Sequence, residues 1–397
     1  MKLKPNFKNI NFLNKIEKNQ NTNENTNQNT NENKRYIISF PQLGNYCIPI
    51  YNLLAKIIDD KTTTILMPNK TTNKTIDIGT QVSPDFICVP FKYNMGNFIE
   101  SLEKGANVLI QAGGGCRYGY YAEVQEQILR DLGYKFTYIS LLDASGVDIF
   151  KLYKKFKLLN LKLKFKDFAK YFLLTIKMIY ILDEFEKYIR DNIVFEENKG
   201  EFEALHKKFL DELLIVKNIG HLRAIKKKYD TLAKKVKLIA RNGENSLIKV
   251  GVVGELYTSM EPFATFFLER QLANLGIKSK RYTTVTYLLF EKAKAEKGLL
   301  KTAKNYIEYA IGADGTESIA HTLELIDKGY DGIIHIKPFG CTPEINAMPI
   351  LQKISSDKNI PIIYMTFDSQ TSEVGIKTRL EAFYDMLKMK KENGVRF

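Results

Sequence analysis

From Arg35 onward, short β-branched hydrophobic runs alternate with stretches of helical apolar spacing. Up to residue 144 this pattern predicts strands at 36–40, 62–67, 86–89, 106–112 and 136–141, and helices at 45–58, 72–79, 94–103 and 117–132. Strictly alternating strands and helices are typical of a parallel sheet that is covered by helices on both faces. Residues 35–144 are therefore predicted to form a Rossmann-like lobe.

The pattern changes near residue 145 and returns near residue 246. The intervening stretch, 145–245, shows long lysine-rich helical patterns without a convincing strand. After it, strands are predicted at 247–253, 276–282, 332–336 and 361–366, and helices at 262–275, 343–355 and from 377. The predicted fold class is α/β, with two Rossmann-like parallel-sheet lobes, 35–144 and 246–397, on either side of a helical region at 145–245.

The chain opens with a polar stretch, and no segment has the pattern of a membrane span. Residues 19–34 are an asparagine-rich, low-complexity tract that cannot bury apolar surface, so 1–34 is predicted to be a disordered tail. The longest apolar run, 172–182, is interrupted by Lys177 and is shorter than the roughly 20 residues that cross a bilayer. These features, together with only four cysteines, predict a cytoplasmic protein with reduced thiols.

The formal net charge of +14 raises the hypothesis of nucleic-acid binding. Many of the lysines lie in two helical stretches, 151–177 and 207–237, and the aromatic residues of the first recur at helical spacing, which is more typical of a core than of base stacking. An anionic small molecule or an acidic protein is therefore favoured as the partner over a nucleic acid.

Three cysteines stand where predicted strands lead into predicted helices, which is where parallel sheets bind ligands. Cys88 ends the strand at 86–89, Cys116 follows the strand at 106–112 and the loop Gly113–Gly115, and Cys341 follows the strand at 332–336. A helix N-terminus lowers the pKa of a thiol and favours the thiolate that metals bind. We therefore expect the three thiols to converge between the lobes. Their wide spacing matches no compact metal motif, and Cys47 has a similar position, so buried core cysteines remain an alternative.

Several segments around these cysteines resemble a known family. They are CVPFK at 88–92, GGCRYGYY at 114–121 and PFGCTPE at 338–344. They are similar to the cysteine motifs of the 2-hydroxyacyl-CoA dehydratase family, and most closely to an uncharacterised branch related to the carboxy-terminal part of CoA enzyme activases. The segments GELY at 254–257 and TRLEAF at 378–383 fit the same branch, and the similarity runs from about Tyr36 to Leu387.

The resemblance implies a [4Fe-4S] or related iron–sulfur cluster that is held by Cys88, Cys116 and Cys341, with one iron open to substrate. It also implies a separate ATP-hydrolysing activase that delivers a low-potential electron, and a homo- or heterodimer. The reaction would be a radical dehydration or reduction of an acyl-CoA thioester or another small molecule. A non-catalytic, cluster-bearing scaffold that docks an activase remains the alternative. Cys47 matches no motif, and Gly114 replaces the proline that relatives carry.

Other residues near the motifs are weaker candidates for chemistry. Arg117 and Lys92 are candidates for binding the cluster or a CoA phosphate, or else are surface cations. Arg117 and Glu344 are candidate catalytic residues, although a carboxylate in the first turn of a helix more often stabilises that helix. His335 lies in a buried-looking strand and is predicted to belong to the core.

Overall fold

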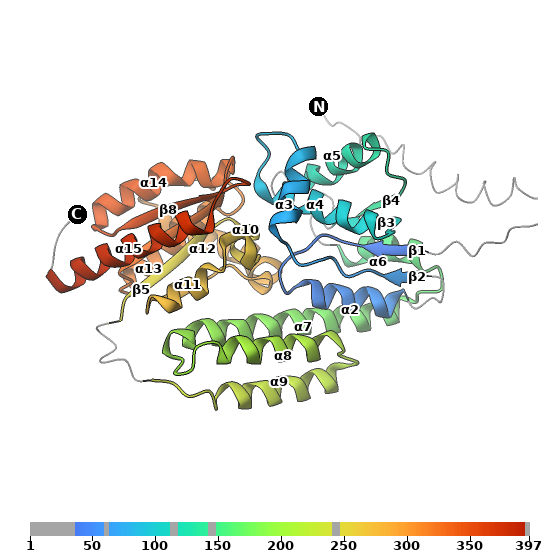
Figure 1. Ribbon diagram of the computed structural model, residues 1–397, viewed down its shortest axis with the longest axis horizontal. Helices are drawn as coiled ribbons and strands as arrows, with labels where there is room; N and C mark the ends of the chain where they lie inside the picture. The colour runs from blue at the N-terminus through green and yellow to red at the C-terminus, as the bar shows by residue number, and fades with distance from the viewer. Residues whose placement is uncertain (1–35, 59–62, 112–117, 142–147, 240–246, 394–397) are drawn as a thin grey trace, which may run out of the picture. The chain divides into compact units, whose positions relative to one another are not determined.

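The computed structural model describes residues 36–58, 63–111, 118–141, 148–239 and 247–393 (Figure 1). All of them belong to one compact unit of the chain. The predicted disordered tail at 1–34 lies outside the described residues.

The first sheet has four parallel strands in the order β2 (Thr63–Ile65), β1 (Tyr36–Ser39), β3 (Val108–Gln111) and β4 (Thr137–Ser140). Its helices are α2 (Cys47–Ile57), α3 (Asn73–Val82), α4 (Val89–Glu103) and α5 (Tyr118–Asp131). Every residue of β3 is buried, as expected for a central strand between two helical layers. In this order, β1 and β3 flank the point where the chain switches direction across the sheet, the usual ligand position in such folds.

The second sheet repeats this order with β6 (Lys278–Arg281), β5 (Lys249–Gly254), β7 (Gly332–Pro338) and β8 (Ile362–Phe367), all parallel. Its α-helices are α10 (Leu256–Met260), α11 (Leu268–Asn274), α12 (Lys292–Ala303), α13 (Gly315–Asp327), α14 (Thr342–Lys358) and α15 (Glu373–Asn393). A 3-10 helix at Pro262–Thr265 and a π-helix at Tyr287–Glu291 complete it. The two parallel sheets confirm the predicted α/β fold class.

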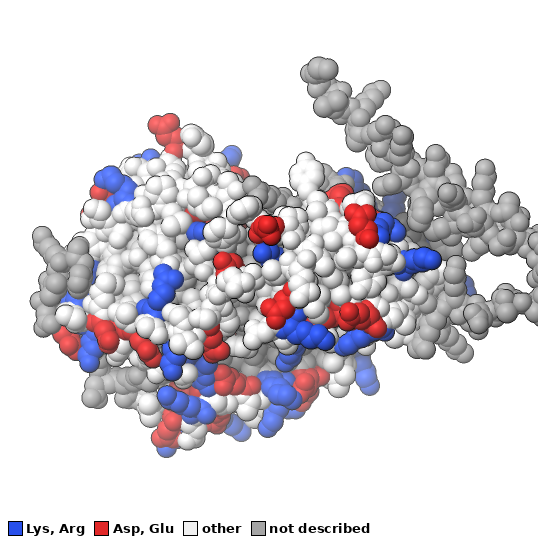
Figure 2. Space-filling model, turned by 45° about the horizontal axis from the view of Figure 1, so that its top comes forward, with Lys and Arg blue, Asp and Glu red and all other residues white. Residues whose placement is uncertain are grey.

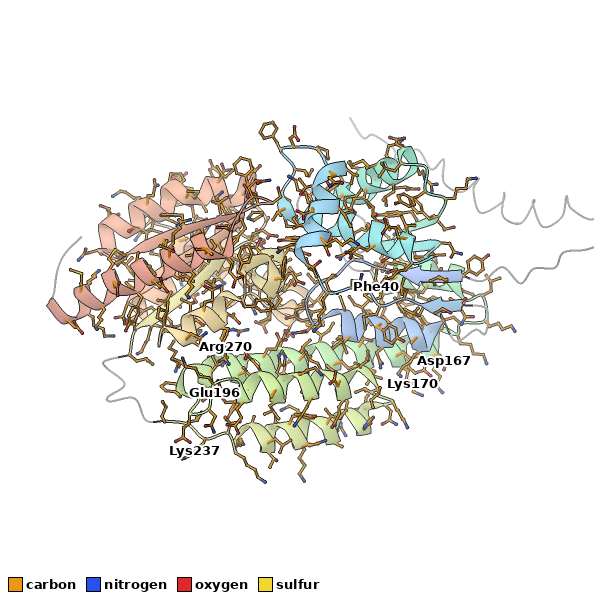
Figure 3. The ribbon with its side chains drawn as sticks, in the orientation of Figure 1. Phe40, Asp167, Lys170, Glu196, Lys237 and Arg270 are labelled. Carbon is orange, nitrogen blue, oxygen red and sulfur yellow. The ribbon has the colours of Figure 1, made fainter. Side chains whose placement is uncertain are left out.

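The middle of the chain is helical, with α6 (Ile149–Leu159), α7 (Phe165–Asn192), α8 (Glu201–Leu214) and α9 (Ile219–Ala233), and a 3-10 turn at Ile193–Phe195. The apolar faces of α7, α8 and α9 form one core, which also includes Tyr46, Met260 and Val285 from the two sheet-bearing parts. Glu196, just after the 3-10 turn, accepts from Arg270 of α11 at 3.0 Å, and Figure 3 labels both side chains. The helical region thus contacts both halves, while the lobe boundaries at 144 and 245 stay a prediction.

The segment that follows β1 packs directly against the segment that follows β5. The backbone N–H of Gly44 donates to the buried Glu261 carboxylate at 2.7 Å. The rings of Tyr93 and Tyr257 stack with centroids 6.0 Å apart, within an apolar cluster that also includes Val89. These contacts bring the carboxyl ends of the two central strands, β1 and β5, toward a shared region.

Two sequence-based predictions of elements were wrong. The strand predicted at 86–89 is a turn, and α4 begins at Val89 rather than at residue 94. Proline is tolerated in the first turn of a helix, so Pro90 does not delay it, and a short apolar run does not distinguish a strand from a buried helix. The helix predicted at 262–275 is divided because Phe266 and Phe267 have φ values of 50° and 56°.

Acidic and basic side chains are interspersed over the face seen in Figure 2. Several lysines of the helical region form ion pairs with nearby carboxylates: Lys187–Asp191, Lys207–Asp211, Lys226–Asp230, Lys228–Glu212 and Lys237–Glu197. Part of the local positive charge is therefore compensated within the chain. Within the described ranges, no helix is both long and apolar enough to cross a membrane.

Candidate functional site

Cys88 and Cys341 occupy equivalent local positions. Each has extended backbone angles and is the residue directly before a helix, Cys88 before α4 and Cys341 before α14. A proline in the first turn of each helix, Pro90 and Pro343, fits there because this position requires no hydrogen-bonded N–H. Both cysteines are half-buried, and Cys88 also packs against the apolar cluster that contains Phe91 and Met95.

The loops that carry these two cysteines adjoin, although they come from different halves of the chain. A Cβ atom added to Gly340 would lie 3.2 Å from the carbonyl oxygen of Phe86. Cys88 is also close enough for its charge to raise the pKa of Cys341. The structure therefore places the loops that carry Cys88 and Cys341 beside each other, while the convergence of all three thiols stays a prediction. Cys116, Arg117 and the loop Gly113–Gly115 lie outside the described residues.

The helix that starts two residues after Cys116 packs against the helix that starts after Cys88. Tyr121 of α5 places its hydroxyl 2.6 Å from the Cys88 sulfur, and its ring meets Phe91 of α4 edge to face with centroids 4.9 Å apart. The beginnings of α4 and α5 are thus fixed beside each other. Sequence reasoning did not single out Tyr121, although it lies within the GGCRYGYY segment.

Glu255 contributes a buried carboxylate at the carboxyl end of β5. It accepts from the backbone N–H groups of Tyr257 at 3.0 Å and Thr258 at 2.9 Å, and from the Thr258 hydroxyl at 2.7 Å, and so caps α10. Burial, and secondly the charge of Asp314, raise the pKa of Glu255 to about 7 despite these hydrogen bonds. A carboxyl group of this kind holds a proton near neutral pH.

Glu344 lies in the first turn of α14 and is completely buried. Its carboxylate is 2.6 Å from Nε2 of His335 on β7 and accepts from the Ser318 hydroxyl of α13 at 3.1 Å. His335 is also fully buried. The backbone N–H of Ile345 donates to the Cys341 carbonyl at 2.9 Å. The His335–Glu344 pair therefore fixes the start of α14, and with it the backbone that carries Cys341.

The pKa of Cys341 is raised, so the predicted lowering at a helix N-terminus was wrong for this residue. Burial is the largest cause, and the charges of Glu255, Glu344 and Cys88 add to it. Such a thiol keeps its proton until a metal ion displaces it, because metal binding and thiol deprotonation are coupled.

Two lysines stand four residues from the two cysteines. Lys92 follows Cys88 on α4 and Lys337 precedes Cys341 at the end of β7, and both are buried. Burial lowers the pKa of Lys337, while the charges of Cys341 and Glu344 oppose this effect. Sequence reasoning singled out Lys92 but missed Lys337 and Glu255. Lys337 and Glu255 could have been identified as candidates because both stand at the carboxyl ends of neighbouring central strands.

Cys47 has different surroundings. It is buried, its thiol donates to the Gln42 side chain at 3.0 Å, and it accepts from the Leu43 N–H at 3.1 Å. Burial raises its pKa to about 12. This environment is that of a small core residue.

The cysteines on the adjoining loops, Cys88 and Cys341, are ligands of the chemical type that an iron–sulfur cluster requires. Thiolates are the usual protein ligands of such clusters, and the two described cysteines stand directly before two helices on adjoining loops. Among the residues the structure describes, no group of three or more His, Cys, Asp or Glu side chains is arranged to hold a metal ion. Cys116 is not among those residues.

Comparison with protein families gives one match. The family described as 2-hydroxyglutaryl-CoA dehydratase, D-component, matches residues 207–387, a range that contains the second sheet, Glu255, Lys337 and Cys341. A comparison with curated proteins found no similar sequence. Residues 207–387 therefore match the 2-hydroxyglutaryl-CoA dehydratase D-component family, which confirms the resemblance over the part of the chain that contains the segments at 254–257, 338–344 and 378–383.

Proposed function

We propose that this protein is an iron–sulfur component of a dehydratase or reductase system. In this proposal Cys88, Cys116 and Cys341 hold a [4Fe-4S] or related cluster, and a separate ATP-hydrolysing activase donates a low-potential electron to it. The observation that carries the proposal is the approach of the Cys88 and Cys341 loops from the two halves of the chain. The family match of residues 207–387 supports it.

When bound, such a cluster supplies one-electron reduction and an open iron for a substrate oxygen. The roles of the protein are to hold and orient. The first turns of α4 and α14 fix two of the thiols, and the His335–Glu344 pair secures the second of these turns. Glu255 is a candidate for holding a proton near the site at neutral pH, because its pKa is about 7. Lys92 and Arg117 remain candidates for binding an anionic substrate group.

The substrate class we propose is an acyl-CoA thioester or another small molecule with a reducible carbonyl group. A cytoplasmic location and a homo- or heterodimeric assembly complete the proposal, as the family implies. The second candidate function is a non-catalytic scaffold that carries a cluster and docks an activase. The adjoining cysteine loops are compatible with both, because both require the same ligands.

Anaerobic electron paramagnetic resonance of the reduced protein separates these functions. The catalytic component should show a cluster signal that changes when acyl-CoA thioesters are added, since substrate would reach the open iron. The scaffold should show a signal that no thioester alters. Colourless, iron-free protein with all three cysteines intact would contradict both.

A further inference from the structure

Tyr121 of α5 holds its hydroxyl against the sulfur of Cys88, the residue directly before α4. The two atoms are 2.6 Å apart, although the residues are 33 positions apart in the chain. Tyr121 is 3% exposed, and its ring meets Phe91 of α4 edge to face with centroids 4.9 Å apart. Both rings belong to the apolar cluster that includes Met95 and Leu109. The packing of the ring therefore fixes where the hydroxyl lies.

The contact between this hydroxyl and Cys88 has one direction once the sulfur binds a metal. In metal-free protein either group can donate, because a thiol and a phenol each carry one proton and each can accept one. A cluster-bound sulfur has lost its proton, since a metal binds the thiolate. The sulfur can then only accept, so the Tyr121 hydroxyl becomes the donor. A hydrogen bond to an ionised acceptor is roughly twice as strong as one between neutral groups.

Such a hydrogen bond has two consequences for an iron–sulfur cluster. Hydrogen bonds to the sulfurs help to set the reduction potential, because they stabilise the additional negative charge of the reduced cluster. A group that bonds to a metal ligand also fixes the orientation of that ligand, and its loss typically weakens metal binding by roughly 10- to 100-fold. The geometry at Cys88 is suited to both effects.

The segment that carries the third cysteine also carries Tyr121. Tyr121 is the last residue of GGCRYGYY at 114–121 and stands five residues after Cys116. Helix α5 begins at Tyr118, so Tyr121 lies in its first turn. The start of α5 thus supplies a hydrogen-bonding partner to the cysteine that stands before α4.

We propose that Tyr121 is a positioning residue that donates a hydrogen bond to the Cys88 sulfur in the loaded protein. This bond orients the Cys88 ligand and raises the reduction potential of the cluster. The proposal rests on the proposed function, because the hydroxyl acts on the cluster through Cys88. It adds a group, other than the three thiols, that sets how readily the cluster accepts an electron.

The test variant is Tyr121→Phe, which removes the hydroxyl and keeps the ring that packs against Phe91. Tyr120→Phe is the matched control, because Tyr120 is the neighbouring residue of α5 and is 76% exposed. Circular dichroism verifies folding. If Tyr121→Phe does not fold or does not bind iron, 3-fluorotyrosine at position 121 takes its place. Fluorine makes the phenol a stronger donor, so this protein should show a less negative potential than the wild type.

The first readout is the midpoint potential of the loaded protein, measured by an anaerobic redox titration with electron paramagnetic resonance. The potential should shift to more negative values in Tyr121→Phe, because the reduced cluster loses a stabilising hydrogen bond. The second readout is the rate at which a chelator removes iron, which should rise about tenfold in Tyr121→Phe. Tyr120→Phe should match the wild type in both readouts.

A loaded Tyr121→Phe or 3-fluorotyrosine protein with the wild-type potential would overturn this proposal and leave the proposed function intact. Equal shifts in Tyr121→Phe and Tyr120→Phe would also overturn it, since the effect would not depend on the contact with Cys88. Wild-type protein that binds no iron would instead overturn the proposed function, and this proposal with it.

Discussion

Gly340 lies against the carbonyl of Phe86, so that the residue before Cys341 touches the turn that leads to Cys88. A Cβ atom at Gly340 would stand 3.2 Å from this oxygen, and its φ of 76° is a left-handed conformation that favours glycine. The two cysteine loops therefore approach each other so closely that a side chain at residue 340 would press on the turn before Cys88.

Gly340→Ala should be more destabilising than an alanine at a comparable glycine. The left-handed backbone conformation at this position costs a residue with a Cβ atom about 1 kcal/mol. The new methyl group would also lie too close to the Phe86 carbonyl oxygen. Gly329→Ala is the control, because Gly329 has a φ of 72° and no atom within 4 Å of the added Cβ. Urea unfolding measures both. Equal losses for the two variants would show that the loops do not press on each other.

Removal of the Glu344 carboxylate should lower the unfolding free energy, because the buried His335–Glu344 pair stabilises the start of α14. Glu344→Ala leaves His335 and Ser318 buried without their partner and should cost about 3 kcal/mol of unfolding free energy. Glu373→Ala is the control, since Glu373 is an exposed carboxylate in the first turn of α15 and should cost less than about 1 kcal/mol. A similarly small loss of unfolding free energy in both variants would show that the His335–Glu344 pair does not stabilise the fold.

Glu255 should make the metal-free protein less stable as the pH rises toward 7. Its pKa in the folded protein is about 7, above its ordinary value of 4.5. Between pH 4.5 and pH 7 the folded state therefore binds a proton that the unfolded state has released. This contribution is fully present below pH 4.5 and is lost as the pH rises through 7. Glu255→Gln should flatten this decline, which unfolding free energies measured from pH 4.5 to 8 would show. An unchanged slope would mean that Glu255 ionises normally.

Nucleic-acid binding should be weak at physiological salt. Five lysines of the helical region have carboxylate partners within the chain, which leaves less charge to replace counterions on a polyanion. Filter binding of duplex DNA and single-stranded RNA at two salt concentrations measures this directly. Tight binding that falls steeply with salt would favour the nucleic-acid hypothesis instead.

The sequence was sufficient for the fold class because periodicity is a local property. The buried strand at β3 and the strands at β5, β7 and β8 follow from runs of β-branched residues between turn signals. The turn at residues 86–88 was misread as a strand, because the apolar residues around Cys88 belong to a buried helix start.

The site could be predicted only in part, because its energetics depend on packing. The positions of Cys88 and Cys341 before helices follow from local sequence, but the burial that raises the pKa of Cys341 does not. The pairing of His335 with Glu344 and the neighbouring positions of Glu255 and Lys337 arise from sheet register, which one sequence does not specify residue by residue.

The central claim is that three particular thiols hold one cluster. Its most direct test is the iron and sulfide content of anaerobically purified wild type and of serine variants at Cys88, Cys116, Cys341 and Cys47. Serine is a poorer ligand for iron, so each of the first three variants should lose or degrade the cluster. Cys47→Ser should keep it, because the Cys47 thiol is buried among its own neighbours. Full iron content in Cys341→Ser together with its loss in Cys47→Ser would contradict the assignment.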